Sequence, residues 1–93
     1  MTAIQTAVET LASTARIAVE AGFTRTQAAK LVCENAVTES DKAMARTGVW
    51  NAESTTEQIE AVLFIGSVAR DAIAGDVVRP SVGNVRDAIV NAI

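Results

Sequence analysis

The side chains that most often carry out chemistry in proteins are scarce in this sequence. Its 93 residues include no histidine, no tyrosine and one cysteine, Cys33. Serine and threonine hydroxyls are frequent, but they need a base to become nucleophiles, and no histidine can serve as that base. Cys33 lies among apolar residues with no second cysteine or histidine to activate it, so we interpret it as a small buried side chain.

Acidic residues are the remaining candidates for acid–base chemistry. Glu57 pairs with either Glu53 or Glu60 at helical spacing, and such a pair works as acid and base only if burial separates the two pKa values. The simpler interpretation is a helix start enriched in acids, which the helix dipole favours. A carboxylate or Cys33 enzyme stays an alternative that requires a deep pocket holding titratable groups.

Metal and cofactor sites are not predicted either. Without histidine and with one cysteine, the chain has no ligand set for zinc, and its five glycines are too isolated to form a phosphate-binding loop. We therefore expect no metal, no cofactor and no enzymatic activity.

Charge and hydropathy limit the kinds of partner and the cell compartment that we expect for this protein. The net charge is -3 and the pI is near 4.8, and the lysines and arginines do not cluster into a basic stripe. Both features argue against nucleic-acid binding. The longest apolar run, residues 61–66, is too short to cross a bilayer, and the first residues lack the charged leader of a signal peptide. We expect a cytoplasmic protein.

The first two helices are predicted from apolar spacing and from end signals. Residues 2–21 place apolar side chains on one face, and Gly22 followed by Phe23 is typical of a helix end. Thr24 to Gln27 matches a capping box that opens a second helix over residues 25–37, with Leu31 among its inward residues.

Three further segments complete the predicted architecture. Residues 38–41 either cap a new short helix through residues 42–46 or continue the second helix. Ser54 to Glu57 is a second capping box, which opens a helix over residues 55–74. Residues 76–81 are predicted to form a turn, Pro80 suits the start of a last helix from about Val82, and no strand is predicted.

The helix over residues 55–74 is apolar on most of its sides. Such a helix is buried on most sides, so it is either the centre of a bundle or half of a dimer interface, where Gly66 would permit close approach of a neighbour. We predict an all-α fold, a compact orthogonal bundle of four to five helices in one domain (residues 1–93), with this helix at its centre. The apolar set is mostly alanine and valine, which bury little area each, so self-association would add to a thin core.

Trp50 is the residue best suited to anchor a partner, because Trp and Arg dominate binding hot spots. It lies on a predicted connector after Lys42 and Arg46, and Phe64 is the large apolar residue of the following helix. These four residues are the predicted partner-binding set. The alternative is that Trp50 closes one end of the bundle.

Two short segments resemble nucleic-acid-binding proteins. Residues 21–29 are loosely similar to the corner of a helix-turn-helix motif, but the second helix runs on through residues 30–36 without the second turn that motif needs. Residues 79–86 resemble the opening of a plasmid replication-region DNA-binding domain, and no residue roles carry over from this short match. A dimeric helix-turn-helix regulator is therefore the alternative function, and it needs its cations to converge on one side: Arg25, Lys30, Lys42 and Arg46.

The main functional prediction is binding to another protein. A small acidic helical chain without chemistry-bearing residues suits a protein that binds and modulates, or inhibits, a larger protein or complex. Such proteins are frequent among phage and mobile-element inhibitors. The partner is another protein or a second copy of the chain.

Overall fold

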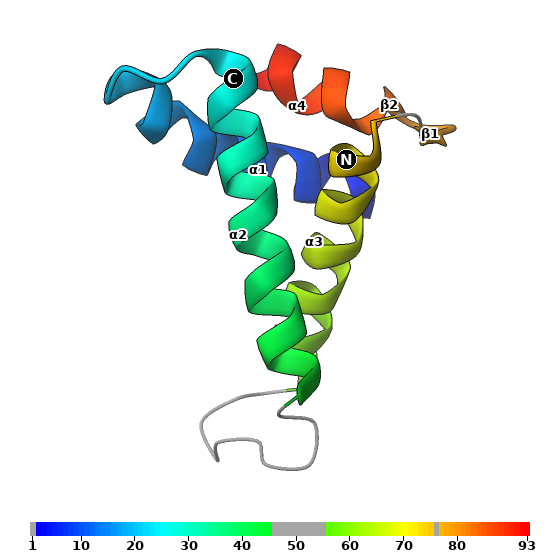
Figure 1. Ribbon diagram of the computed structural model, residues 1–93. Coiled ribbons are helices and arrows are strands. Elements are labelled where there is room, and N and C mark those ends of the chain that lie inside the picture. Colours follow the sequence, from blue (N-terminus) through cyan, green and yellow to red (C-terminus); the bar gives the residue numbers. More distant parts are fainter. Residues whose placement is uncertain (1, 46–55, 76) are drawn as a thin grey trace.

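The computed structural model describes residues 2–45, 56–75 and 77–93 of the chain. These residues form four helices: α1 (Ala3–Glu20), α2 (Arg25–Ala45), α3 (Thr56–Ala74) and α4 (Val85–Ala92). The helices α2 and α3 run antiparallel, and α1 and α4 cross them near one end (Figure 1). The described residues are thus mostly helical, as the sequence predicts.

The corner between α1 and α2 forms as its end signals predict. Gly22, with φ of 112°, donates its N–H to the Val19 carbonyl at 3.0 Å, and the Phe23 N–H bonds to Ala18 at 3.1 Å. This pair of bonds closes the helix end because glycine tolerates the positive φ. Thr24 and Gln27 then exchange backbone-to-side-chain hydrogen bonds of 3.1 Å each, which confirms the capping box.

The second helix is longer than its predicted end at residue 37. It continues through residues 38–41 to Ala45, so the separate helix over residues 42–46 is wrong and the alternative of continuation is confirmed. Thr38 does not cap a new helix, because its hydroxyl donates to the Glu34 carbonyl one turn earlier at 3.0 Å. The predicted features on residues 46–55, including Trp50 and the start of the second capping box, lie outside the described residues.

A short hairpin replaces the predicted start of the last helix. The strands β1 (Val78–Arg79) and β2 (Gly83–Asn84) pair antiparallel, and Pro80 lies in the turn between them, which the Val82 N–H closes by bonding to the Arg79 carbonyl at 3.1 Å. Proline at the second position of a turn has its φ already set. The helix α4 begins later, where the Asn84 side chain accepts from the Asp87 N–H at 3.1 Å.

The core lies where α1 crosses α2, α3 and α4. Among the described residues, only Leu11 and Ile89 are both buried and larger than valine, since the other buried apolar side chains are alanine, valine and Cys33. Small side chains let helix axes approach closely but bury little area each. Leu31, predicted to face inward, is exposed.

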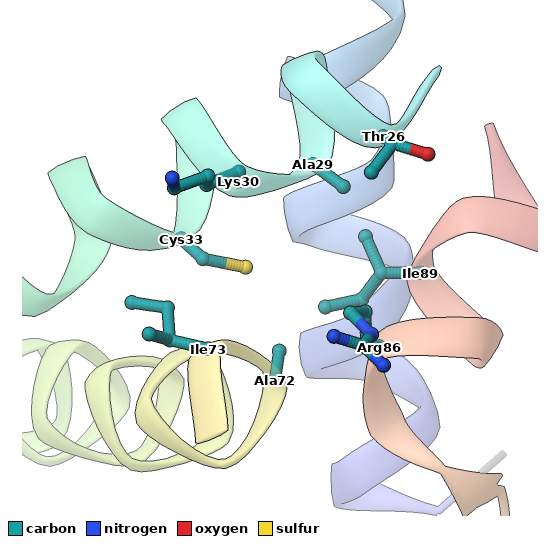
Figure 2. Close-up of a pocket in the computed structure, with 8 residues that line it drawn as sticks. All are labelled: Thr26, Ala29, Lys30, Cys33, Ala72, Ile73, Arg86 and Ile89. Atoms are coloured by element: carbon teal, nitrogen blue, oxygen red, sulfur yellow. The ribbon is translucent and has the colours of Figure 1, made fainter. Parts of the chain in front are cut away.

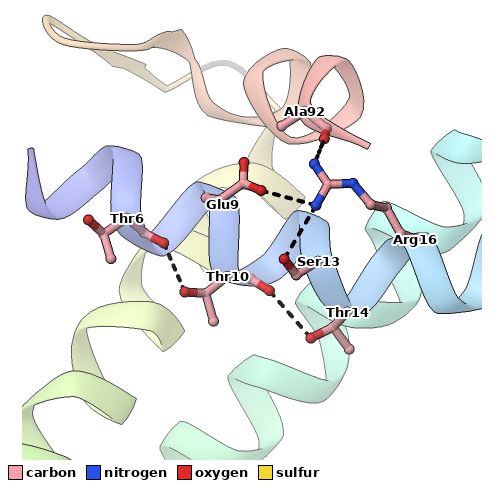
Figure 3. A network of polar contacts seen from close by, with 7 residues as sticks. All are labelled: Thr6, Glu9, Thr10, Ser13, Thr14, Arg16 and Ala92. Atoms are coloured by element: carbon pink, nitrogen blue, oxygen red, sulfur yellow. Dashed lines mark hydrogen bonds and ion pairs between the residues drawn. The ribbon is translucent and has the colours of Figure 1, made fainter. Parts of the chain in front are cut away.

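One arginine ties the outer face of α1 to the end of α4. Arg16 pairs with Glu9 at 3.0 Å and also donates to the carbonyl of Ala92 in the last turn of α4 (Figure 3). A cation at this position complements the negative end of the helix dipole. A different face of α1 carries threonines whose hydroxyls bond one turn back, including Thr10 to the Thr6 carbonyl at 2.9 Å (Figure 3).

The far halves of α2 and α3 extend beyond α1 and α4 as a two-helix arm (Figure 1). We define the arm as residues 38–45 of α2 and 56–64 of α3. The hydrophobic core reaches Val37 and Ile65 and does not continue into the arm, in which Ser40 alone of the described residues is buried. The helix α3 contacts α1, α2 and α4, but in the arm the described residues pack only α2 against it, so the prediction that this helix is the centre of a bundle stays a prediction.

Candidate functional site

The predicted partner-binding residues do not form one cluster in the part of the chain that the structure describes. Lys42 and Phe64 are both exposed, whereas Trp50 and Arg46 lie outside the described residues. Ser40 and Gly66 are in contact between α2 and α3. Lys42 is two residues after Ser40, and Phe64 is two residues before Gly66. Two residues turn a helix by about 200°, so Lys42 and Phe64 point away from that contact in opposite directions.

The cations required for DNA binding are spread around α2. At about 100° per residue, Lys30 and Lys42 are rotated by roughly 140° and 260° from Arg25, so these three side chains point in three directions. Lys42 is also engaged with Glu39 at 3.4 Å. The geometry of the described cations does not favour the DNA-binding alternative.

The base of the arm is a close contact between Ser40 and Gly66. A Cβ built on Gly66 would overlap both the Cβ and the hydroxyl oxygen of Ser40. The prediction that Gly66 permits close approach of a helix is confirmed, with α2 as that helix. Asp41 and Arg70 form an ion pair across the same two helices.

Beyond this contact, the apolar side chains of α3 are open to solvent. Phe64 is 38% exposed and Val62 is 37% exposed, while Ile59 and Leu63 are half-buried without packing against the core. Met44 at the end of α2 is exposed as well. The arm therefore presents apolar surface on more than one side.

The candidate groups for chemistry that lie in the described residues are Cys33, Glu57 and Glu60. Burial, with a smaller effect of the neighbouring Glu34, raises the pKa of Cys33 to about 11, so the thiol is protonated and weakly nucleophilic at neutral pH. Glu57 and Glu60 are exposed on the arm, and Glu53 lies outside the described residues. No group of three potential ligand side chains within residues 2–45, 56–75 and 77–93 is placed to hold a metal ion.

Sequence reasoning missed Ser40 as a structural residue and missed the arm as a unit. The signal for Ser40 was its place on the continuation of the second helix, opposite a glycine on the partner helix. Recognising this contact requires the antiparallel register of α2 and α3, which the sequence does not show.

A comparison with protein-family models, with curated proteins and with solved structures finds no match to this chain. Within the described residues, no helix has both the length and the apolar character needed to cross a membrane.

Proposed function

We propose that this chain is a non-enzymatic helical protein that binds another protein through the arm and modulates it. The observation that carries the proposal is the absence of any buried apolar side chain among the described residues of the arm, although α3 continues there as Ile59, Val62, Leu63 and Phe64. A helix that is apolar on most sides is normally covered on most sides. A partner that supplies one or two helices against the arm completes a small bundle.

The distribution of large side chains supports the same proposal. Both phenylalanines of the chain are exposed, Phe23 at 46% and Phe64 at 38%, while alanine and valine fill most of the core. Burial of a large apolar side chain stabilises a complex by up to about 1.5–3 kcal/mol, and the open arm leaves part of this free energy for a partner. Exposed apolar surface of this kind is typical of protein interaction sites.

In this proposal the protein acts in the cytoplasm, where a free thiol such as that of Cys33 stays reduced. The proposal includes inhibition of a larger complex as one form of modulation. It requires no ligand set, nucleophile or nucleic-acid surface.

The first experiment is a tagged pull-down from lysate, with and without nuclease, using wild type, Phe64→Asp and Ile17→Asp. Ile17 is the matched control, because it is 68% exposed and lies on α1, outside the arm. We expect a stoichiometric partner that resists nuclease, is retained by Ile17→Asp and is lost by Phe64→Asp, with both variants folded by circular dichroism. Equal retention by the two variants would contradict a role for the arm.

Light scattering of the purified chain distinguishes the two kinds of partner. A dimer that Phe64→Asp converts to a monomer identifies the second copy as the occupant of the arm. If the wild-type chain is a monomer, the partner that covers the arm is a different protein.

A further inference from the structure

A pocket lies at the opposite end of the molecule from the tip of the arm. It has a volume of about 260 Å³ and is enclosed by α2, α3 and α4 (Figure 2). Its floor is apolar and consists of the buried residues Ala29, Cys33, Ala72 and Ile89, and the exposed side chain of Ile73 forms an apolar wall beside it. The Cys33 side chain points into this space, and its raised pKa keeps the thiol neutral, so it adds no charge to the floor.

The rim of the pocket carries two cations and no acid. Lys30 comes from α2 and Arg86 from α4, and Thr26 of α2 also lines the pocket, with its hydroxyl directed away from both cations (Figure 2). The Arg86 guanidinium lies directly over Gly75, where a Cβ would be 2.9 Å from its Nη1 atom. Because Gly75 has no side chain, the Arg86 guanidinium can lie against its backbone.

These two cations differ from most others in the described parts of the chain. Arg16, Lys42, Arg70 and Arg79 each pair with a carboxylate. Lys30 and Arg86 form no ion pair with any described residue, in a chain whose net charge is -3. Two cations without an ion pair to a described residue, beside an apolar floor, are complementary to a molecule with one anionic group and an apolar body.

The volume sets the size of that molecule. An apolar cavity of about 150 Å³ holds benzene, so a pocket of this size holds a body of roughly ten non-hydrogen atoms. We propose that the pocket binds a small organic carboxylate of this size, with its carboxylate on the Arg86 guanidinium, toward which the flexible Lys30 side chain turns on binding, and its apolar body inside the pocket. This site uses none of the arm and is independent of the proposed protein-binding function.

The test is a titration of the isotope-labelled chain with 3-phenylpropionate and octanoate, followed by amide chemical shifts in NMR spectra. We expect saturable shifts at the floor residues and a Kd on the order of 0.1–1 mM for an unoptimised ligand. The matched probes 3-phenylpropanol and 3-phenylpropylamine carry the same body without the anion, and should bind at least tenfold more weakly. Equal binding of the acid and the alcohol, or no saturable shift with either acid up to about 10 mM, overturns the proposal.

Variants identify the cations responsible. The double variant Lys30→Met and Arg86→Met should weaken 3-phenylpropionate binding at least tenfold while its amide spectrum stays that of a folded chain. Arg25→Met is the matched control, since Arg25 is also an exposed α2 cation without an ion pair to a described residue, but it does not line the pocket. Loss of affinity in Arg25→Met equal to that in the double variant would show a general charge effect and overturn the site.

Discussion

Ser40 of α2 and Gly66 of α3 lie so close together that no side chain larger than hydrogen fits at position 66. Ser40 is completely buried, and its hydroxyl oxygen has no hydrogen-bond partner among the described residues. The two residues thus fix the separation of the helices at the base of the arm by steric contact rather than by a polar bond.

Gly66→Ala should destabilise the fold by about 1–3 kcal/mol, because the new methyl group would overlap the Ser40 Cβ, which moves only if the backbone moves. Without this contact, alanine would be favoured over glycine in a helix by about 1 kcal/mol. A loss of stability in Gly66→Ala is therefore expected only because of the contact with Ser40. Urea denaturation followed by circular dichroism measures the change. Ser67→Ala, at the exposed neighbouring position, is the control and should stay within about 0.5 kcal/mol of wild type. A Gly66→Ala chain as stable as wild type would contradict the close contact.

Ser40→Ala should stabilise the fold by about 1 kcal/mol, because it removes a buried hydroxyl that has no hydrogen-bond partner among the described residues. The same denaturation experiment measures the gain. A loss of more than about 1 kcal/mol would show that the hydroxyl is satisfied in solution.

The pair can also be tested as a unit. Ser40→Gly combined with Gly66→Ala should recover at least about 1 kcal/mol relative to the sum of the single changes, since the two positions are in contact. Additive effects would indicate that residues 40 and 66 do not touch.

The buried thiol of Cys33 predicts a loss of stability at alkaline pH. Its pKa rises from 9.0 to about 11 on folding, so the folded chain holds this proton more tightly than the unfolded chain. The stabilisation from the neutral thiol is fully present below pH 9 and disappears as the pH rises through 11, by up to about 2–3 kcal/mol. The free energy of unfolding should therefore fall more between pH 8.5 and 11 in wild type than in Cys33→Ala. Parallel pH profiles for the two chains would show that the thiol is not buried.

Arg16→Met should loosen α4 with little effect elsewhere, because Arg16 is the side chain that donates to the Ala92 carbonyl in the last turn. We expect a loss of about 1–2 kcal/mol, together with faster amide hydrogen exchange in residues 85–92. Glu9→Gln removes the exposed ion pair but keeps the arginine, and should cost less than about 1 kcal/mol. Exchange in α4 that is unchanged in Arg16→Met would contradict this role.

The elements that the sequence predicts correctly are those that depend on neighbours along the chain. The corner at Gly22, Thr24 and Gln27 closes through hydrogen bonds between residues at most five positions apart, so its signals are local. The all-α class follows from apolar spacing for the same reason.

The errors occur where distant residues decide the outcome. The neighbours of Ser40 leave open whether residues 38–41 cap a new helix or continue the second one, whereas in the structure Ser40 is buried inside a continuous helix against Gly66. Pro80 lies in a turn, as predicted, but that turn joins two paired strands, and α4 begins at Val85 with Asn84 as its cap rather than near Val82. The pocket joins Lys30 to Arg86 across 56 positions, and no local pattern places these side chains together.

The most direct measurement of the proposed function is site-specific photo-crosslinking. A benzophenone amino acid at position 64 samples the arm, and the same amino acid at position 17 samples the outer face of α1. We expect a discrete, nuclease-resistant crosslinked protein from position 64 and none from position 17 in the same lysate. Equal crosslinking from both positions, or none from position 64 in a lysate where the tagged chain retains a partner, would contradict the arm as the binding surface.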